Sequence, residues 1–288
     1  MLPSRFDYHR ASSVEEALSL LDDYGEDAKV LAGGQSLIPL MKLRFVSPGH
    51  LIDIDPIPGL DGIEEREGSL ALGALVRHNQ LASSEIITNG YPTLAAAAPQ
   101  IADPIVRNLG TIGGSLAHAD PAGDLGSVML SMGANVVLRS SSGERVVPIG
   151  EFLVDTFTTS ITPNELLTEI RIPTPPPRSG GSYLKLERKV GDFVTVAVAV
   201  TLSLQDGTVG SAGIALTGVG LKNIEAAEAA ASLHGTAPTD EAFAEAGRLA
   251  AAASNPVTDV RGTDTYKRHM VEVYTRRGLA TASAMAAG

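Results

Sequence analysis

The order of hydrophobic and polar residues in the N-terminal half of the chain predicts helices between short strands. Apolar residues at 14, 17, 18 and 21 recur at helical spacing behind Ser13, a residue type favoured at helix N-caps, so we expect a helix up to Gly25. A short apolar run at 29–32 then predicts a strand, and the pattern becomes helical again over 36–44. The same criteria predict helices at 93–101 and 128–132, and strands at 51–54, 70–74, 134–138, 144–148 and 166–172.

A proline-rich segment at 173–181 interrupts this pattern. Its prolines stiffen the backbone and its glycines end it, so we expect a domain junction there, with domains at 1–177 and 178–288. The second domain is predicted to be α+β, a sheet with helices on one side. Its expected elements are strands at 194–204 and 210–219, joined by a turn at Asp206-Gly207, and helices at 224–233 and 239–253.

Composition and charge narrow the classes of function. The chain has 288 residues, 44% of them hydrophobic, which is ample for a buried core, and its formal net charge of −11 argues against a nucleic-acid partner. It has no cysteine, so it cannot form a disulfide, use a thiolate nucleophile or hold a cysteine-ligated iron–sulfur cluster. No run of about 18 apolar residues predicts a transmembrane segment, and no signal peptide is evident, so a cytoplasmic location is expected.

Two glycine pairs, Gly33-Gly34 and Gly113-Gly114, stand 80 residues apart. One such pair is as consistent with a tight strand-to-helix turn as with a binding loop. Two pairs, each followed by a hydroxyl or amide side chain, favour backbone N–H groups that bind both phosphates of a dinucleotide. Neither loop matches the Walker A motif or a full Rossmann motif, which disfavours a nucleotide triphosphatase and a separate NAD domain.

The segment after the second glycine pair contains three residues with titratable side chains, His118, Asp120 and Asp124. Asp124 could accept hydrogen bonds from ribose hydroxyls, although Asp120 and Asp124 are also suited to capping turns or helices. His118 and Asp120 could suggest a metal pair, but the six histidines are scattered without ligand spacing. No serine lies in a nucleophile motif, so no catalytic side chain and no metal ligand is nominated, and a bound cofactor would have to carry any electron transfer.

Five motifs occur in order along the chain. They are Ala32-Gly33-Gly34-Gln35-Ser36-Leu37, Ile101-Ala102-Asp103-Pro104 with Arg107, Thr111-Ile112-Gly113-Gly114, Asp120-Pro121-Ala122-Gly123-Asp124 and Arg188-Lys189-Val190-Gly191-Asp192-Phe193. Together they resemble the FAD-binding medium subunit of the molybdenum hydroxylases, the xanthine dehydrogenase family, and by pattern its carbon monoxide dehydrogenase type. The resemblance spans nearly the whole chain.

The resemblance implies an α+β fold that begins with a two-lobed FAD-binding domain of the vanillyl-alcohol-oxidase (PCMH) type, with lobes at about 1–57 and 58–177. An α+β C-terminal domain with a small antiparallel sheet and helices follows. By the same resemblance, the residues that bind FAD are Ala32, Gly33, Gly34, Gln35, Ser36, Leu37, Ile101, Thr111, Ile112, Gly113, Gly114, Ser115, Asp124, Lys185 and Phe193.

Three of these residues depart from the pattern of the carbon monoxide dehydrogenase type. Phe193 stands where that type usually has a tyrosine beside the flavin ring, so it can stack on the ring but has no hydroxyl to donate. Gln35 replaces a frequent histidine and Ser115 a common asparagine. Both changes are tolerable where backbone amides do most of the binding.

The resemblance also implies partners, because in this family the medium chain does not oxidise the substrate. Electrons leave a molybdopterin centre in a large subunit, pass two [2Fe–2S] clusters in a small subunit and reach FAD in the medium chain, which passes them to an external acceptor. The expected assembly is a dimer of heterotrimers, which its partners could bring to the inner face of the membrane. The absence of cysteine agrees with this division of labour.

Two alternatives remain open at this stage. A self-contained flavin oxidase would act on its own small organic substrate, but no histidine or tyrosine has a sequence setting that nominates a base. A scaffold that kept the fold without the flavin would be expected to have lost the glycine pairs or Asp124, and all of these are present.

Overall fold

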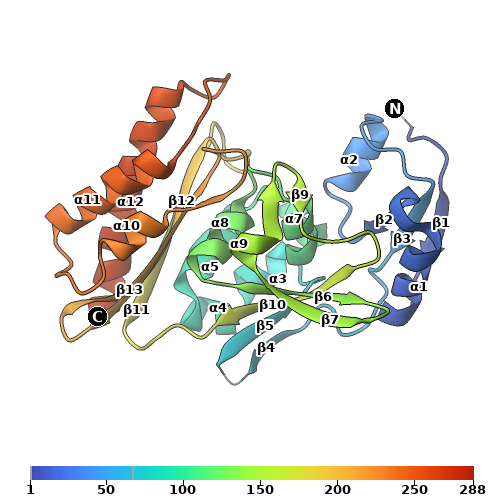
Figure 1. Cartoon of the computed structure of the whole chain (residues 1–288), viewed down its shortest axis with the longest axis horizontal. Helices are drawn as coiled ribbons and strands as arrows, with labels where there is room; N and C mark the ends of the chain where they lie inside the picture. Colours follow the sequence, from blue (N-terminus) through green and yellow to red (C-terminus); the bar gives the residue numbers. More distant parts are fainter. Residues whose placement is uncertain (1, 67) are drawn as a thin grey trace.

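The computed structural model describes residues 2–66 and 68–288 and arranges them in three parts side by side along the long axis (Figure 1). The first part, which we call the N-terminal lobe, contains a parallel sheet in the order β1-β3-β2. Helix α1 packs its apolar face, including Leu18 and Leu21, against Ile52 of this sheet. The elements of the lobe are β1 (Asp7–Arg10), α1 (Val14–Tyr24), the 3₁₀ turn η1 (Gly25–Asp27), β2 (Ala28–Leu31), α2 (Leu37–Lys42) and β3 (His50–Asp53).

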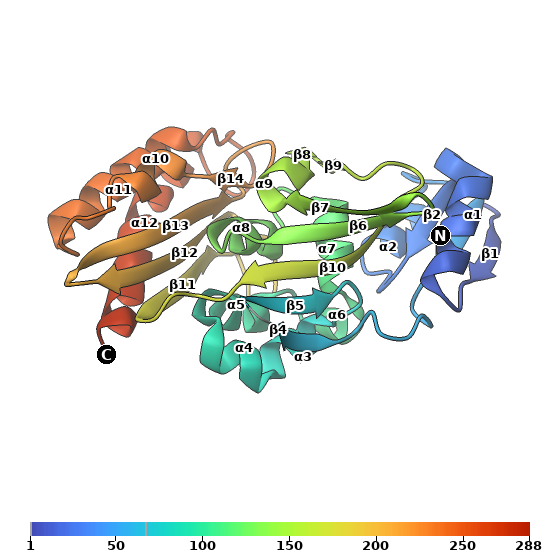
Figure 2. The ribbon, with the colours of Figure 1, turned by 60° about the horizontal axis from the view of Figure 1, so that its bottom comes forward.

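The central part contains an antiparallel sheet in the order β4-β5-β10-β6-β7, with most of its helices on one face (Figure 2). Its strands are β4 (Ile63–Arg66), β5 (Ser69–Gly73), β6 (Asn135–Ser140), β7 (Gly143–Pro148) and β10 (Leu166–Pro173), and β8 (Leu153–Asp155) with β9 (Thr158–Thr159) form a separate hairpin. Its helices are α3 (His78–Ser83), α4 (Glu85–Gly90), α5 (Pro92–Ala97), η2 (Ala98–Gln100), α6 (Pro104–Leu109), α7 (Ile112–His118), α8 (Asp124–Ser131) and α9 (Ile149–Phe152).

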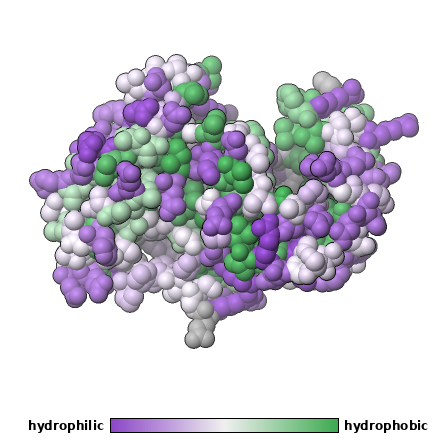
Figure 3. All heavy atoms as spheres, in the orientation of Figure 1, coloured by the Kyte–Doolittle hydropathy of each residue, from purple (hydrophilic) through white to green (hydrophobic). Residues whose placement is uncertain are grey.

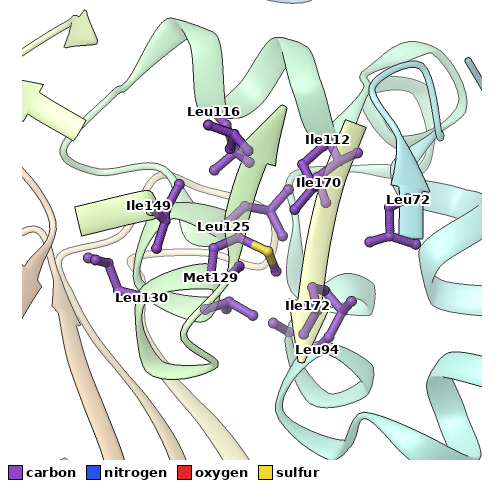
Figure 4. Close-up of a cluster of buried hydrophobic side chains, with 14 of the residues drawn as sticks. Leu72, Leu94, Ile112, Leu116, Leu125, Met129, Leu130, Ile149, Ile170 and Ile172 are labelled. Atoms are coloured by element: carbon purple, nitrogen blue, oxygen red, sulfur yellow. The ribbon is translucent and has the colours of Figure 1, made fainter. Parts of the chain in front are cut away.

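A fully apolar core lies between this sheet and its helices. Figure 4 shows Ile112 and Leu116 of α7 pointing toward Ile170 of the sheet and toward Leu125 and Met129 of α8. Each of these five side chains is essentially inaccessible to solvent. The second glycine pair, at the start of α7, is therefore fixed by the core beneath it.

The C-terminal part is an antiparallel sheet in the order β11-β12-β13-β14 whose own helices lie on one face, as the sequence predicts, while helices of the central part pack against the other face. Valines and leucines of β12 and β13 face α11 and α12, while Ala197, Ala199 and Ala215 join the core with α5 and α8 of the central part. Its elements are β11 (Ser179–Leu186), β12 (Val196–Gln205), β13 (Thr208–Thr217), β14 (Ile224–Glu225), α10 (Ala227–Ala231), α11 (Asp240–Ala253) and α12 (Asp264–Ala287).

Three local expectations from the sequence are corrected. Gly180 and Gly181 lie inside β11 rather than ending the proline-rich segment. The helix expected over 224–233 is a short strand followed by the five-residue helix α10. No helix was expected after residue 253, yet α12 is the longest helix among the described residues, with 24 residues.

The packing of α12 explains why the sequence pattern hides it. Its buried side is formed largely by small or polar residues, among them Thr275, Gly278 and Ala282, so the apolar stripe is weak. A Cβ on Gly180 of β11 would lie 2.0 Å from the carbonyl oxygen of Ala282, so helix and sheet meet backbone to backbone. Close approach, rather than large apolar side chains, holds this helix in place.

Candidate cofactor site

The first glycine loop connects β2 to α2. Gly34 has a left-handed backbone, with φ of +71°, which a glycine adopts without steric cost. A Cβ on Gly33 would lie 2.1 Å from the carbonyl oxygen of Leu109, so this loop touches the segment just before the second glycine pair. The Gln35 amide donates back to the Gly33 carbonyl at 3.1 Å. In this loop Ser36 is exposed, and the other predicted residues, 32–35 and 37, are half-buried.

The second glycine pair lies in the first turn of α7. Thr111 is the N-cap, and its hydroxyl accepts a hydrogen bond from the Gly114 N–H at 3.1 Å. Gly113 is buried, and a Cβ there would lie 2.6 Å from the Cβ and the carbonyl oxygen of Ala74. Packing within the protein is therefore sufficient to explain a glycine at 113.

Gly114 differs, because it is exposed and faces the first loop. Within the described chain, only the Thr111 hydroxyl at 2.8 Å and the Ala32 Cβ at 3.9 Å come close to a Cβ built there. The two glycine loops therefore lie next to each other, with Gly114 exposed beside the first loop. Such an arrangement suits the diphosphate of a dinucleotide, which needs N–H donors and close backbone approach.

Figure 3 shows a notch between the N-terminal lobe that carries α2 and the rest of the molecule. Two other hollows lie elsewhere. One, of about 180 Å³, lies over the outer face of the five-stranded sheet among the ion pairs that Arg66 and Arg171 make with Glu169. The other, of about 600 Å³, lies between α1 and the β6–β7 hairpin. Neither is lined by a predicted site residue.

A buried polar cluster joins the central part to the C-terminal part. Asp124, the first residue of α8, accepts a hydrogen bond from the Tyr183 hydroxyl at 2.7 Å and forms an ion pair with the Lys185 ammonium at 3.0 Å. Lys185 also donates to the Gln100 carbonyl at 2.9 Å and lies 3.3 Å from Glu187. Only 1% of the Lys185 side chain is exposed, so its charge depends on these partners.

Burial raises the pKa of Asp124, and the nearby Lys185 ammonium and the Tyr183 hydroxyl oppose that rise. Burial and the Asp124 carboxylate both raise the pKa of Tyr183, so its hydroxyl stays protonated and donates. Asp124 is thus engaged by protein groups. Its carboxylate offers the Lys185 ammonium a counter-charge within this cluster.

Ile101 and Phe193 come from two loops that touch one another. Ile101 is buried, and its carbonyl accepts from Arg107 at 2.9 Å. The next residue, Ala102, has a left-handed backbone, and a Cβ on Gly191 would lie 2.7 Å from its carbonyl oxygen. Phe193 is 58% exposed, so its ring is free to cover a ligand.

The structure therefore brings most of the predicted residues into two neighbouring groups. One is the pair of glycine loops, where Thr111, Ile112 and Gly113 are buried, Ser115 is half-buried and Gly114 is open. The other is the cluster of Asp124 and Lys185, which Gln100 connects to Ile101.

Sequence reasoning missed Tyr183 and His78. Tyr183 and Lys185 alternate along β11 and so share one face, and Glu187 continues the alternation just past the end of the strand, a period-two signal that could have indicated the cluster. His78 lies against Gly110, beside the glycine loops, and burial lowers its pKa to about 4, with help from the charges of Arg107 and Arg77. It is therefore a neutral, buried imidazole at neutral pH.

Comparison with known protein families decides the class of this chain. Residues 4–175 match the family model described as the FAD binding domain in molybdopterin dehydrogenase. The chain belongs to this family. Residues 181–282 match the CO dehydrogenase flavoprotein C-terminal domain. These matches confirm the family predicted from the motifs and the order of an FAD-binding domain and an α+β C-terminal domain.

Members of this family with established names align with the chain along its whole length. The carbon monoxide dehydrogenase medium chain of Hydrogenophaga pseudoflava is 43% identical over 287 residues, which is 100% of both chains. The 6-hydroxypseudooxynicotine dehydrogenase complex subunit alpha of Paenarthrobacter nicotinovorans is 41% identical and covers 98% of this chain and 96% of its own. A solved carbon monoxide dehydrogenase from Hydrogenophaga pseudoflava superposes with a TM-score of 0.96 at 44% identity, over 99% of each chain.

The chain is therefore an FAD-binding oxidoreductase subunit of the molybdenum hydroxylase class. Of the helices in residues 2–66 and 68–288, none combines the length and the apolar character that crossing a bilayer requires. Nor do three histidine, cysteine, aspartate or glutamate side chains gather there at a spacing suited to a metal ion.

Proposed function

We propose that this chain is the medium subunit of a molybdenum hydroxylase of the carbon monoxide dehydrogenase type. It takes electrons from the [2Fe–2S] clusters of a small subunit and passes them to an external acceptor, while the substrate is oxidised at the molybdopterin of a large subunit. The assembly we propose is a dimer of heterotrimers. Support comes from the full-length identity of 43% with a carbon monoxide dehydrogenase medium chain.

The observation that carries the proposal is the facing pair of glycine loops. We assign the FAD diphosphate to the backbone N–H groups of 32–37 and 111–115, because the two loops lie next to each other and Gly114 is exposed beside Ala32. Bound FAD supplies the capacity to accept and release electrons, which ordinary side chains lack.

The residues at the other end of the site have different roles in this proposal. Phe193 covers the flavin ring with its exposed aromatic face, and Lys185 holds a positive charge near it. Asp124 forms an ion pair with Lys185, and the Tyr183 hydroxyl holds the Asp124 carboxylate in place through a hydrogen bond. The two domains of 1–177 and 178–288 would thereby meet at the cofactor, with β11 bringing Lys185 to α8.

The test is a visible absorption spectrum of the tagged chain, purified gently from its native cell. Flavin bands together with a broad iron–sulfur shoulder that bleaches on reduction are the expected result, since this chain has no cysteine to ligate a cluster itself. Flavin bands without the shoulder, together with steady oxidation of an organic substrate by the isolated chain, would indicate a self-contained flavin oxidase instead. A colourless protein would overturn the cofactor assignment.

A further inference from the structure

The loop at 187–195 carries Phe193 and connects β11 to β12. The side chains of Val190 and Phe193 are 95% and 58% exposed, so packing against the core does not hold the tip of this loop. Two hydrogen bonds shape it from within: the Asp192 N–H donates to the Lys189 carbonyl at 3.0 Å, and the Phe193 N–H donates to the Asp192 carboxylate at 2.8 Å. The ring of Phe193 has no polar atom, so no conventional hydrogen bond holds the ring itself. Its position therefore depends on the backbone at 193.

Arg261 holds that backbone from a distant part of the chain. Its Nη1 atom donates to the Phe193 carbonyl at 2.9 Å, and its Nη2 atom forms an ion pair with the Asp192 carboxylate at 3.2 Å. The side chains of Arg261 and Asp192 are only 23% and 18% exposed. Because the guanidinium is planar and its donors have a fixed geometry, the two contacts together fix the chain at 192–193.

The turn that carries Arg261 is itself anchored to α12. Lys267 of that helix is only 2% exposed, and its ammonium forms an ion pair with Asp259 at 2.7 Å and donates to the Val257 carbonyl at 2.9 Å. The Asp259 carboxylate also accepts a hydrogen bond from the Arg261 N–H at 2.8 Å. Moving this turn would leave a buried ammonium without its partners, which is costly. The turn therefore presents the Arg261 side chain to the loop at 187–195 from a fixed place.

An ion pair elsewhere in the chain shows how the Arg261 contact differs from an ordinary surface pair. Arg248 and Glu245 lie three residues apart on α11, and their side chains are 63% and 51% exposed. Such exposed pairs contribute little to stability and connect no distant segments. Arg261 instead donates to a main-chain atom 68 residues away, so its contact constrains the conformation of another loop.

We infer that Arg261 is a positioning residue for the flavin site: by holding the backbone of Phe193, it keeps the aromatic ring over the flavin. The inference rests on the proposed function, which assigns Phe193 to cover the flavin ring. Arg261 touches no flavin in this arrangement and acts through Phe193. A ring that is already held loses less freedom when the flavin binds, and preorganisation of this kind slows dissociation of the ligand.

The experiment measures FAD in the native complex, purified through the tagged chain. The rise of FAD fluorescence after dilution follows release of the flavin, and its circular dichroism in the visible region reports how rigidly its surroundings are held. We expect Arg261→Gln to release FAD at least about fivefold faster and to lose part of the visible circular dichroism. Arg261→Lys can replace one of the two contacts and should recover part of both. Arg248→Gln is the control and should match the wild type in both.

A double variant separates positioning of the ring from a general structural role. Phe193→Ala should itself speed FAD release and reduce the visible circular dichroism. Because Arg261 acts through the Phe193 ring, adding Arg261→Gln to Phe193→Ala should change neither measurement further. A further loss as large as in the wild-type background would overturn the inference, since Arg261 would then act on the fold and not on the ring.

Failure of the inference and failure of the proposed function give different results. Wild-type FAD release and circular dichroism in Arg261→Gln, beside altered values in Phe193→Ala, would overturn the inference alone. A wild-type complex without flavin, or a Phe193→Ala variant that matches the wild type in both measurements, would contradict the proposed function in its FAD or Phe193 assignment, and the inference would fall with it.

Discussion

At the scale of single residues, the two members of the second glycine pair have different reasons to be glycine. Gly113 is buried against Ala74, whereas Gly114 is open toward the first loop. Gly113 serves the packing of the fold, whereas the proposed function gives Gly114 a place beside the FAD diphosphate. The sequence pattern does not distinguish the two glycines, but alanine substitutions at the two positions should have different effects.

Gly113→Ala should destabilise the chain by about 1–3 kcal/mol, because its Cβ would overlap the Ala74 backbone. Gly114→Ala should destabilise the flavin-free chain less than Gly113→Ala, because only the Thr111 hydroxyl has to move, and should weaken FAD binding at least about tenfold, or ~1.4 kcal/mol. Thermal unfolding and a flavin fluorescence titration of both variants check this. Equal FAD affinity in Gly114→Ala and wild type would remove the diphosphate from this loop.

The cluster around Asp124 predicts a pH-dependent effect of Lys185→Met. Without the ammonium, Asp124 is a buried carboxylate with no counter-charge, and we expect a loss of about 3–5 kcal/mol near neutral pH. Its folded-state pKa, already raised by burial, rises further. The folded state then keeps the proton to higher pH than the unfolded chain, where the carboxyl titrates near about 3.9, so stability falls as pH rises through that window.

The deficit of Lys185→Met relative to wild type should therefore be smaller at about pH 5 than at about pH 7.5. Urea unfolding at the two pH values measures it. Adding Asp124→Asn to Lys185→Met should recover part of the stability, because no buried charge remains unpaired. A deficit that does not depend on pH would mean that packing, and not charge, is what Lys185 provides.

At the scale of elements, α12 depends on the absence of side chains where it meets the sheet. Gly180→Ala would place a Cβ about 2.0 Å from the Ala282 carbonyl, so we expect α12 to move off β11 and the chain to lose more than about 3 kcal/mol. Gly90→Ala is the control, since a Cβ there meets nothing within 4 Å. Limited proteolysis of α12 and thermal unfolding test this. Equal resistance in both variants would contradict the packing argument.

Elements with a strong local signal could be predicted from the sequence. The Ser13-capped helix is where its pattern predicts it, and the side chain of Ser13 accepts from the Glu16 N–H. The β6–β7 hairpin is likewise present at 135–148. The helix α12 could not be found, because residues such as Thr275 and Gly278 become its buried side only against a sheet that is distant in sequence.

The candidate site shows the same division. The glycine loops can be predicted from the sequence, because few residues besides glycine permit close backbone approach. The pairing of Tyr183 with Asp124 spans 59 residues and the neutral state of His78 follows from burial, so neither is visible until the chain is folded. Features that depend on neighbouring residues can thus be predicted from the sequence, whereas contacts between residues far apart in the chain cannot.

At the scale of the whole molecule, the C-terminal sheet completes the central core. Tyr183, Ala197 and Ala199 belong to the same apolar cluster as Leu72 and Ile170. We therefore expect a fragment of residues 1–177 to expose a large apolar face and to aggregate or remain without fixed tertiary structure. Near-ultraviolet circular dichroism and analytical ultracentrifugation of the fragment check this, with the full chain as the control. A monomeric, cooperatively melting fragment would show that the two domains fold independently.

Strand β12 is buried on both faces along nearly its whole length. Its backbone amides should therefore exchange with deuterium only when the entire chain unfolds, whereas amides near the notch open by smaller local motions. A ligand that binds only the folded chain slows this exchange by a factor of 1 + [L]/Kd, which is RT ln(1 + [L]/Kd) in free energy. The exchange rate of β12, a strand with no residue in the notch, would thus report how tightly the flavin is held.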